Sequence, residues 1–118
     1  MSEVYWLLEL EVIPGQLDNM KSLVNEMVAA TQANEPGTLS YEYSLNADKS
    51  ICHIYERYTD SSAALTHLGT FGSQFAERFM TVFKPVAFTV YGSPSEELKG
   101  ALAAFGPAYM ELAEGFSR

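Results

Sequence analysis

Residues 4–13 alternate between apolar and mixed positions, a pattern typical of a β-strand. Pro14-Gly15 ends this strand. From Leu17 the apolar positions recur every three or four residues, which predicts an amphipathic helix that ends near Asn34. The apolar face of the strand carries Val4, Trp6, Leu8, Leu10 and Val12, and that of the helix carries Leu17, Met20, Leu23, Val24, Met27 and Val28.

The middle of the chain predicts a β-hairpin. Residues 39–45 and 51–58 both alternate in polarity, and Asn46-Ala47-Asp48-Lys49 lies between them as a turn. A further strand is expected over residues 86–92, VAFTVYG.

Two helical segments are expected between the hairpin and that last strand. The first covers residues 62–71, and the second carries apolar side chains from Phe75 to Phe83. A break at Gly72 or Ser73 separates them, and Lys84-Pro85 closes the second. The order β-α-β-β-α-β predicts a ferredoxin-like α+β fold, an antiparallel sheet with both helices on one face.

Residues 93–118 follow this unit. Ser93-Pro94-Ser95-Glu96 resembles a capping box with proline at the first helical position, and Gly106-Pro107 is expected to end the helix. The last eleven residues are expected to form either a packed arm or a frayed tail. We divide the chain into a domain of residues 1–92 and an extension of residues 93–118, which packs on the same domain or on a dimer partner.

The sheet face without helices needs a cover. Large apolar residues occur at consecutive strand positions, such as Trp6 and Leu7, and therefore point to both faces of the sheet. A second copy of the chain, packed sheet against sheet, is the simplest cover, so we predict a homodimer. A cavity is expected between the helices and the sheet, where Gly69 and Gly72 interrupt a phenylalanine-rich region.

Composition narrows the functional classes. A chain of 118 residues, 47% of them hydrophobic, suffices for one domain. Fifteen acidic against seven basic residues give a net charge of -8, which disfavours nucleic acid and anionic membranes as partners. Cys52 is the single cysteine, and no secretion signal or long apolar run occurs, so a cytoplasmic protein is expected.

No cofactor or metal is expected from the motifs. Two histidines and one cysteine cannot supply the four ligands of a usual Cys/His zinc site. The sequence contains no glycine-rich dinucleotide or phosphate loop and no Gly-x-Ser-x-Gly elbow.

His67 and Glu56 are the polar residues on otherwise apolar faces. His67 is either a proton acceptor or hydrogen-bond donor to a bound phenol, or a boundary histidine bonded to a backbone carbonyl. Glu56 shares its strand face with Tyr58, and a carboxylate there either pairs with a basic residue or has a raised pKa in a pocket. The strand aromatics Trp6, Tyr41 and Tyr43 belong to the core or an interface, or hold a flat aromatic ligand.

Residues 35–68 have the sequence EPGTLSYEYSLNADKSICHIYERYTDSSAALTHL. This segment clearly resembles the antibiotic biosynthesis monooxygenase family of dimeric α/β barrels, and the resemblance covers residues 4 to about 92 of the chain. It is carried by Glu35-Pro36-Gly37 before a tyrosine-rich strand, by Glu56-Arg57-Tyr58, and by the helix with His67. It implies oxygen insertion into phenols, anthrones or quinols without metal, flavin or haem. Many members of the family have a second histidine shortly after the position of Thr70. This chain has Phe71-Gly72-Ser73 there and lacks that histidine.

The sequence thus predicts a cofactor-independent monooxygenase that acts on a small aromatic polyphenol, anthrone or quinol with O₂. His67 is the expected base or donor, and Trp6, Tyr43, Glu56, Tyr58 and Phe79 are the expected substrate-binding residues. Two alternatives stay open: a non-catalytic dimeric barrel that binds a small molecule, and an isomerase or decarboxylase that uses proton transfer alone.

Overall fold

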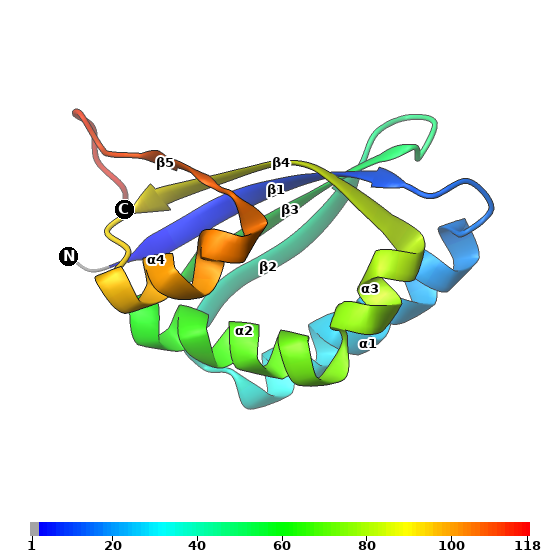
Figure 1. Ribbon diagram of the computed structural model, residues 1–118, viewed down its shortest axis with the longest axis horizontal. Helices are drawn as coiled ribbons and strands as arrows, with labels where there is room; N and C mark the ends of the chain where they lie inside the picture. Colours follow the sequence, from blue (N-terminus) through cyan, green and yellow to red (C-terminus); the bar gives the residue numbers. More distant parts are fainter. Residues whose placement is uncertain (1–2) are drawn as a thin grey trace.

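The computed structural model describes residues 3–118 and contains one mixed α+β unit (Figure 1). The predicted β-α-β-β-α-β order is confirmed, with a short helix, a 3₁₀ turn and a fifth strand added at the C-terminal end. The elements in chain order are β1 (Val4–Val12), α1 (Leu17–Asn34), β2 (Thr38–Leu45), β3 (Ile51–Tyr58), α2 (Ser61–Gln74), α3 (Ala76–Val82), β4 (Phe83–Gly92), α4 (Glu96–Leu102), η1 (Ala103–Phe105) and β5 (Ala108–Met110).

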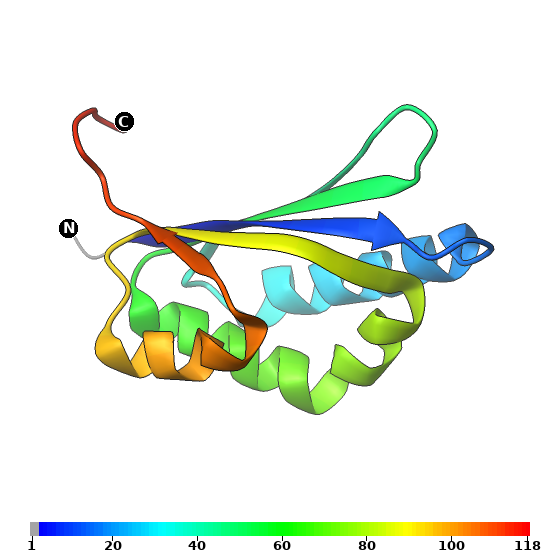
Figure 2. The same ribbon diagram turned by 45° about the horizontal axis from the view of Figure 1, so that its top comes forward.

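The sheet has the strand order β2-β3-β1-β4-β5, and only the β4–β5 pairing is parallel. All four α-helices lie on one face of it, whereas no helix of the described chain covers the other face (Figure 2). The alternation in β1 therefore turns Val4, Trp6 and Leu10 into the core, each at most 2% exposed. Tyr5 and Leu7 lie on the face without helices.

Two clusters of buried side chains fill the space between the sheet and the helices. The larger one joins β1 and β3 to α1 and α3, with Leu10, Ile54, Met27 and Phe79 among its members. The smaller one brings the C-terminal helix onto the sheet, through Val4, Trp6, Tyr58, Ala64, Val90, Leu98 and Leu102. Residues of the extension thus pack against the same chain's β1, β3 and α2.

The predicted break at Gly72 or Ser73 is wrong, because α2 continues to Gln74 and the chain turns at Phe75. A glycine inside a helix costs only about 1 kcal/mol. Phe71 on the same helix packs against the core, which offsets that cost. The helix that carries His67 is therefore one continuous element up to the start of α3.

The last predicted strand begins earlier than expected, at Phe83 instead of residue 86. Lys84-Pro85 does not close the preceding helix, because both residues already pair with β1. The register passes from Ala87 to Pro85 and skips Val86, so the strand contains a β-bulge. Bulges accommodate a proline that would weaken a regular inner strand.

The capping prediction after β4 is partly wrong. Ser95 is the N-cap of α4, where its side chain accepts from the backbone N–H of Leu98, and Pro94 precedes the helix instead of opening it. Gly106 ends the 3₁₀ turn in the left-handed region at φ 62°, as its position before Pro107 suggested. Beyond it, Ala108–Met110 pair with β4 as an arm, and the residues after Met110 are exposed.

Candidate active site

A cavity of about 420 Å³ lies between the sheet and the helices, where the sequence predicted it. Its wall includes five of the six predicted site residues: Trp6, Tyr43, Glu56, His67 and Phe79. Most of the other lining side chains are apolar, which makes the cavity a poor environment for unpaired charge.

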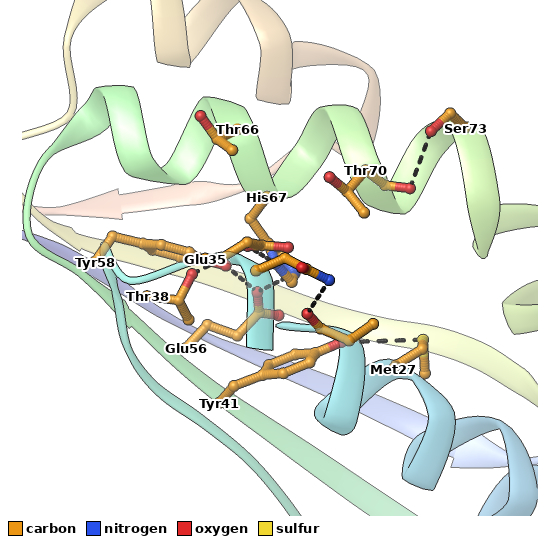
Figure 3. Close-up of polar contacts among 12 residues, drawn as sticks. Met27, Glu35, Thr38, Tyr41, Glu56, Tyr58, Thr66, His67, Thr70 and Ser73 are labelled. Carbon is orange, nitrogen blue, oxygen red and sulfur yellow. Dashed lines mark hydrogen bonds and ion pairs between the residues drawn. The ribbon is translucent and has the colours of Figure 1, made fainter. Parts of the chain in front are cut away.

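His67 lies between two carboxylates in the wall of this cavity (Figure 3). Its Nδ1 atom is 2.8 Å from Oε1 of Glu35, and its Nε2 atom is 3.3 Å from Oε1 of Glu56. All three residues are buried, with exposures of 5–6%. Both ring nitrogens are thus engaged with the protein.

Local structure explains why the three groups meet. Asp60 caps α2 by accepting from the backbone N–H of Ala63, which sets the start of the helix that carries His67. Gly37 lets the loop after α1 approach that helix, because a Cβ at this position would lie 2.6 Å from Cβ of Ala63. Glu35, just after the end of α1, is thereby placed beside Nδ1 of His67.

Tyr58 is hydrogen-bonded to Glu56 in the protein interior. Its hydroxyl donates a short hydrogen bond to Oε1 of Glu56. Burial raises the pKa of Tyr58 well above 10.0, and the charge of Glu56 raises it further, so the hydroxyl stays protonated. Tyr58 is 0% exposed and is not among the residues that line the cavity. Its predicted contact with substrate stays a prediction.

Both contacts of Glu56 use the same oxygen, Oε1, which leaves Oε2 for the cavity that this residue lines. The sequence predicted that Glu56 pairs with an arginine or a lysine, or else has a raised pKa in a pocket. The first alternative is wrong, because its partners are His67 and Tyr58. The carboxylate is held rigidly at the surface of an apolar cavity, which is how a proton acceptor is positioned for catalysis.

Tyr41 and Tyr43 place two phenol hydroxyls beside this carboxylate. The hydroxyl oxygens are 2.7 Å apart, and each lies 3.9 Å from the sulfur of Met27, which is a weak acceptor. Burial raises the pKa of both phenols well above 10.0, and the negative charge of Glu56 adds to the shift. Both hydroxyls therefore remain protonated. Because one of them donates to the other, the pair has one further proton to donate to an oxygen atom of a ligand.

Glu35 and Tyr41 line or support the site but were not among the predicted site residues, although Tyr41 was noted as a strand aromatic beside Tyr43. Glu35 was visible as an acidic residue before Pro36-Gly37, but its contact with His67 joins positions 32 residues apart. Tyr41 follows the same strand alternation as Tyr43, and this spacing was the available signal. In residues 3–118 no group of three or more His, Cys, Asp or Glu side chains is arranged to hold a metal ion.

The fold and the site together define a small α+β protein with an apolar cavity and a buried acid–base cluster at its wall. A model of the antibiotic biosynthesis monooxygenase family matches residues 4–79, which is more than half of the chain. The chain belongs to this family. No match occurs among proteins with curated functions.

Solved structures share this fold. MupZ from Pseudomonas fluorescens is 28% identical with a TM-score of 0.86, over 100% of this chain and 96% of that one. Rv0793 from Mycobacterium tuberculosis is 26% identical with a TM-score of 0.62, over 80% of this chain and 98% of that one. PA3566 from Pseudomonas aeruginosa shares the fold at 16% identity and a TM-score of 0.67, over 80% and 97%. About a fifth of this chain thus lacks a counterpart in the last two.

In the described chain, residues 3–118, no helix is both long and apolar enough to cross a membrane.

Proposed function

We propose that this protein is a cofactor-independent monooxygenase that oxidises an electron-rich phenol or quinol with O₂. The observation that carries the proposal is the Glu56 carboxylate, held by His67 and Tyr58 at the wall of an apolar cavity beside two protonated tyrosines. A deprotonated quinol can itself give an electron to O₂, so the protein needs to supply only a base, hydrogen-bond donors and a dry site.

In this proposal Glu56 accepts the phenolic proton of the substrate. His67 was the expected base, but both of its ring nitrogens already face carboxylates, so it acts as a positioning residue that holds Glu56 in place. Glu35 in turn holds the imidazole ring at Nδ1. The hydrogen-bonded pair of Tyr41 and Tyr43 donates a hydrogen bond to the oxygen on which negative charge develops.

The reaction balances without an external reductant. A hydroquinone and one O₂ give a hydroxyquinone and one water molecule. One oxygen atom forms the new C–O bond, the other leaves as water, and the substrate supplies all four electrons. The proton held by Glu56 is returned to the oxygen that leaves as water.

A proton-transfer reaction without O₂ is the second candidate function. This function is favoured by the polar side chains that line the cavity. Each of them is an acid, a base or a hydrogen-bond donor. An isomerase or a decarboxylase would use Glu56 and the tyrosine pair in the same roles. Oxygen dependence separates the two functions.

Oxygen uptake by the metal-free protein tests the proposal. With a panel of hydroquinones and anthrones, we expect one O₂ consumed per substrate and a product heavier by one oxygen and lighter by two hydrogens. Mass spectrometry under ¹⁸O₂ should place one labelled atom in the product. Turnover of the panel at an equal rate without O₂ would favour the proton-transfer reaction, and no conversion under either condition would favour a binding protein.

We also propose that the protein forms a homodimer through the sheet face that no helix of the described chain covers. Tyr5 lies on the middle strand of the sheet, stacked on Tyr91 at 5.3 Å and edge-on to Tyr55 at 6.4 Å between ring centroids. An aromatic cluster of this kind is typical of the buried centre of an interface.

Light scattering at micromolar concentration is expected to give the mass of two chains, and Tyr5→Glu is expected to give that of one. A charged side chain at the centre of the interface would be buried without a partner. Tyr109→Glu, on the exposed strand β5, is the matched control and should leave the mass unchanged. A monomeric wild-type protein would contradict the proposal.

A further inference from the structure

We infer that the substrate of this site is an elongated amphipathic molecule, a phenol or quinol head with a linear apolar chain. The head meets Glu56, Tyr41 and Tyr43, and the chain runs beneath β1 and β4 and leaves the cavity beside Phe105. This inference deepens the proposed function and rests on it for the chemistry of the head, but its evidence is the shape and the lining of the cavity.

The polar and apolar parts of the wall are separated along the sheet. Tyr41 and Tyr43 belong to β2 and Glu56 to β3, which are the first two strands in the order β2-β3-β1-β4-β5. The next two strands line the cavity with apolar side chains only: Trp6 and Leu8 from β1, and Pro85, Val86, Ala87 and Phe88 from β4. A ligand that satisfies both regions has one polar end and one apolar end.

The cavity is also long. It spans β2 to β4, which are three strand spacings or about 14 Å apart. Its volume of about 420 Å³ falls in the range of sites for drug-sized ligands, about 300–1,000 Å³. A single quinol ring would therefore leave the β4 half of the cavity unfilled.

The apolar half opens to the surface between exposed apolar side chains. Met80 of α3, Val86 of β4 and Phe105 of η1 all line the cavity, and they are 56%, 60% and 56% exposed. Val86 is the residue skipped in the β1–β4 register, and the bulge directs it to this rim. An apolar chain that leaves here would cover all three side chains, whereas a ligand confined to the interior would leave them in water.

The C-terminal extension builds this exit. Leu102, Ala104, Phe105 and Gly106 contribute to the wall. The extension is anchored by Leu98 and Leu102, both 0% exposed, and by the pairing of β5 with β4. Phe105 packs edge-on against Phe88, with 6.4 Å between the ring centroids. We therefore assign to the extension the recognition of the chain of the substrate.

Trp6 provides a direct measure of binding, because it is the single tryptophan of the protein and lines the cavity. We would titrate the protein with hydroquinone and with 2-butyl-, 2-hexyl- and 2-octylhydroquinone without O₂, and record the fluorescence of Trp6. The dissociation constant is expected to fall about three- to fourfold for each methylene that is buried. The decrease should level off once the chain has passed the rim.

Two variants make the test specific for the exit. Phe105→Ala should weaken the octyl compound about tenfold and change the affinity for hydroquinone less than about twofold, because the ring binds at the other end. Phe116→Ala is the matched control, a phenylalanine of the same extension that is 80% exposed and does not line the cavity. It should change neither affinity.

The outcomes separate this inference from the proposed function. A chain-length trend that Phe105→Ala removes supports the inference, even if no compound consumes O₂. Affinity that does not depend on chain length overturns it, even if hydroquinone is turned over. It is also overturned if no probe binds, or if Phe105→Ala and Phe116→Ala weaken the octyl compound equally.

Discussion

Glu56→Gln is expected to lower kcat for quinol oxidation by about 10²- to 10⁴-fold, the usual contribution of a positioned general base. Glutamine has the shape of glutamate and can still accept a hydrogen bond from Tyr58, but its amide does not take up a proton in the neutral range. The loss should therefore appear in kcat, whereas the affinity for an alkylhydroquinone measured through Trp6 should change only a few-fold.

Glu42→Gln is the matched control, because Glu42 is an exposed residue of the same hairpin and does not line the cavity. It should keep the full rate of O₂ uptake. The urea midpoints of both variants verify that each is folded. If folded Glu56→Gln retained more than about a tenth of the wild-type rate, well above the range expected from loss of a base, another group would have to be the proton acceptor.

His67→Phe is expected to reduce the free energy of unfolding by about 3–5 kcal/mol, the typical cost of leaving a buried carboxylate without its partner. Phenylalanine fills much of the same space, so the expected loss is mainly electrostatic. Glu35 and Glu56 would both lose their imidazole partner while they stay buried at 6% exposure. Urea denaturation at pH 7, followed by Trp6 fluorescence, measures the change.

The same substitution at the other histidine separates this effect from the loss of any imidazole. His53 lies 3.7 Å from Glu9, and both side chains are well exposed, so His53→Phe should change the stability by less than about 1 kcal/mol. Adding Glu35→Gln and Glu56→Gln to His67→Phe should restore a large part of the stability, because a neutral amide costs less to bury without its partner than a carboxylate. Equal losses in the two histidine variants, or no recovery in the triple variant, would mean that His67 contributes by packing alone.

Local patterns predicted most of the fold. The hairpin and β1 follow from a period of two in apolar residues, and α1 follows from the helical period, because each pattern directs one face of one element to the core. The errors occur at a glycine and a proline that were expected to interrupt an element but are accommodated by the tertiary structure. α2 passes through Gly72 since Phe71 anchors the helix, and β4 includes Pro85 since a bulge relaxes the pairing at that point.

The candidate site was only partly predictable. His67 and Glu56 were recognised because each is a polar residue on an apolar face, and Trp6, Tyr43 and Phe79 because they are large residues of the predicted core. Their assembly into one cluster was not predictable, since a pattern along one element does not give distances between elements. Tyr58 shares a strand face with Glu56, yet it is directed behind the carboxylate and not into the cavity.

The sequence by itself determined the order of the elements as far as α4, the buried faces of β1 and α1, and the family, because these depend on residues close together in the chain. The tertiary structure alone decided that Glu35 and Glu56 occupy the two nitrogens of His67, which moves the proposed base from the histidine to Glu56. It also decided that Phe105 of the extension lines the same cavity as Tyr41. Both depend on contacts between segments distant in sequence, whose geometry is set by how the helices and the extension pack on the sheet.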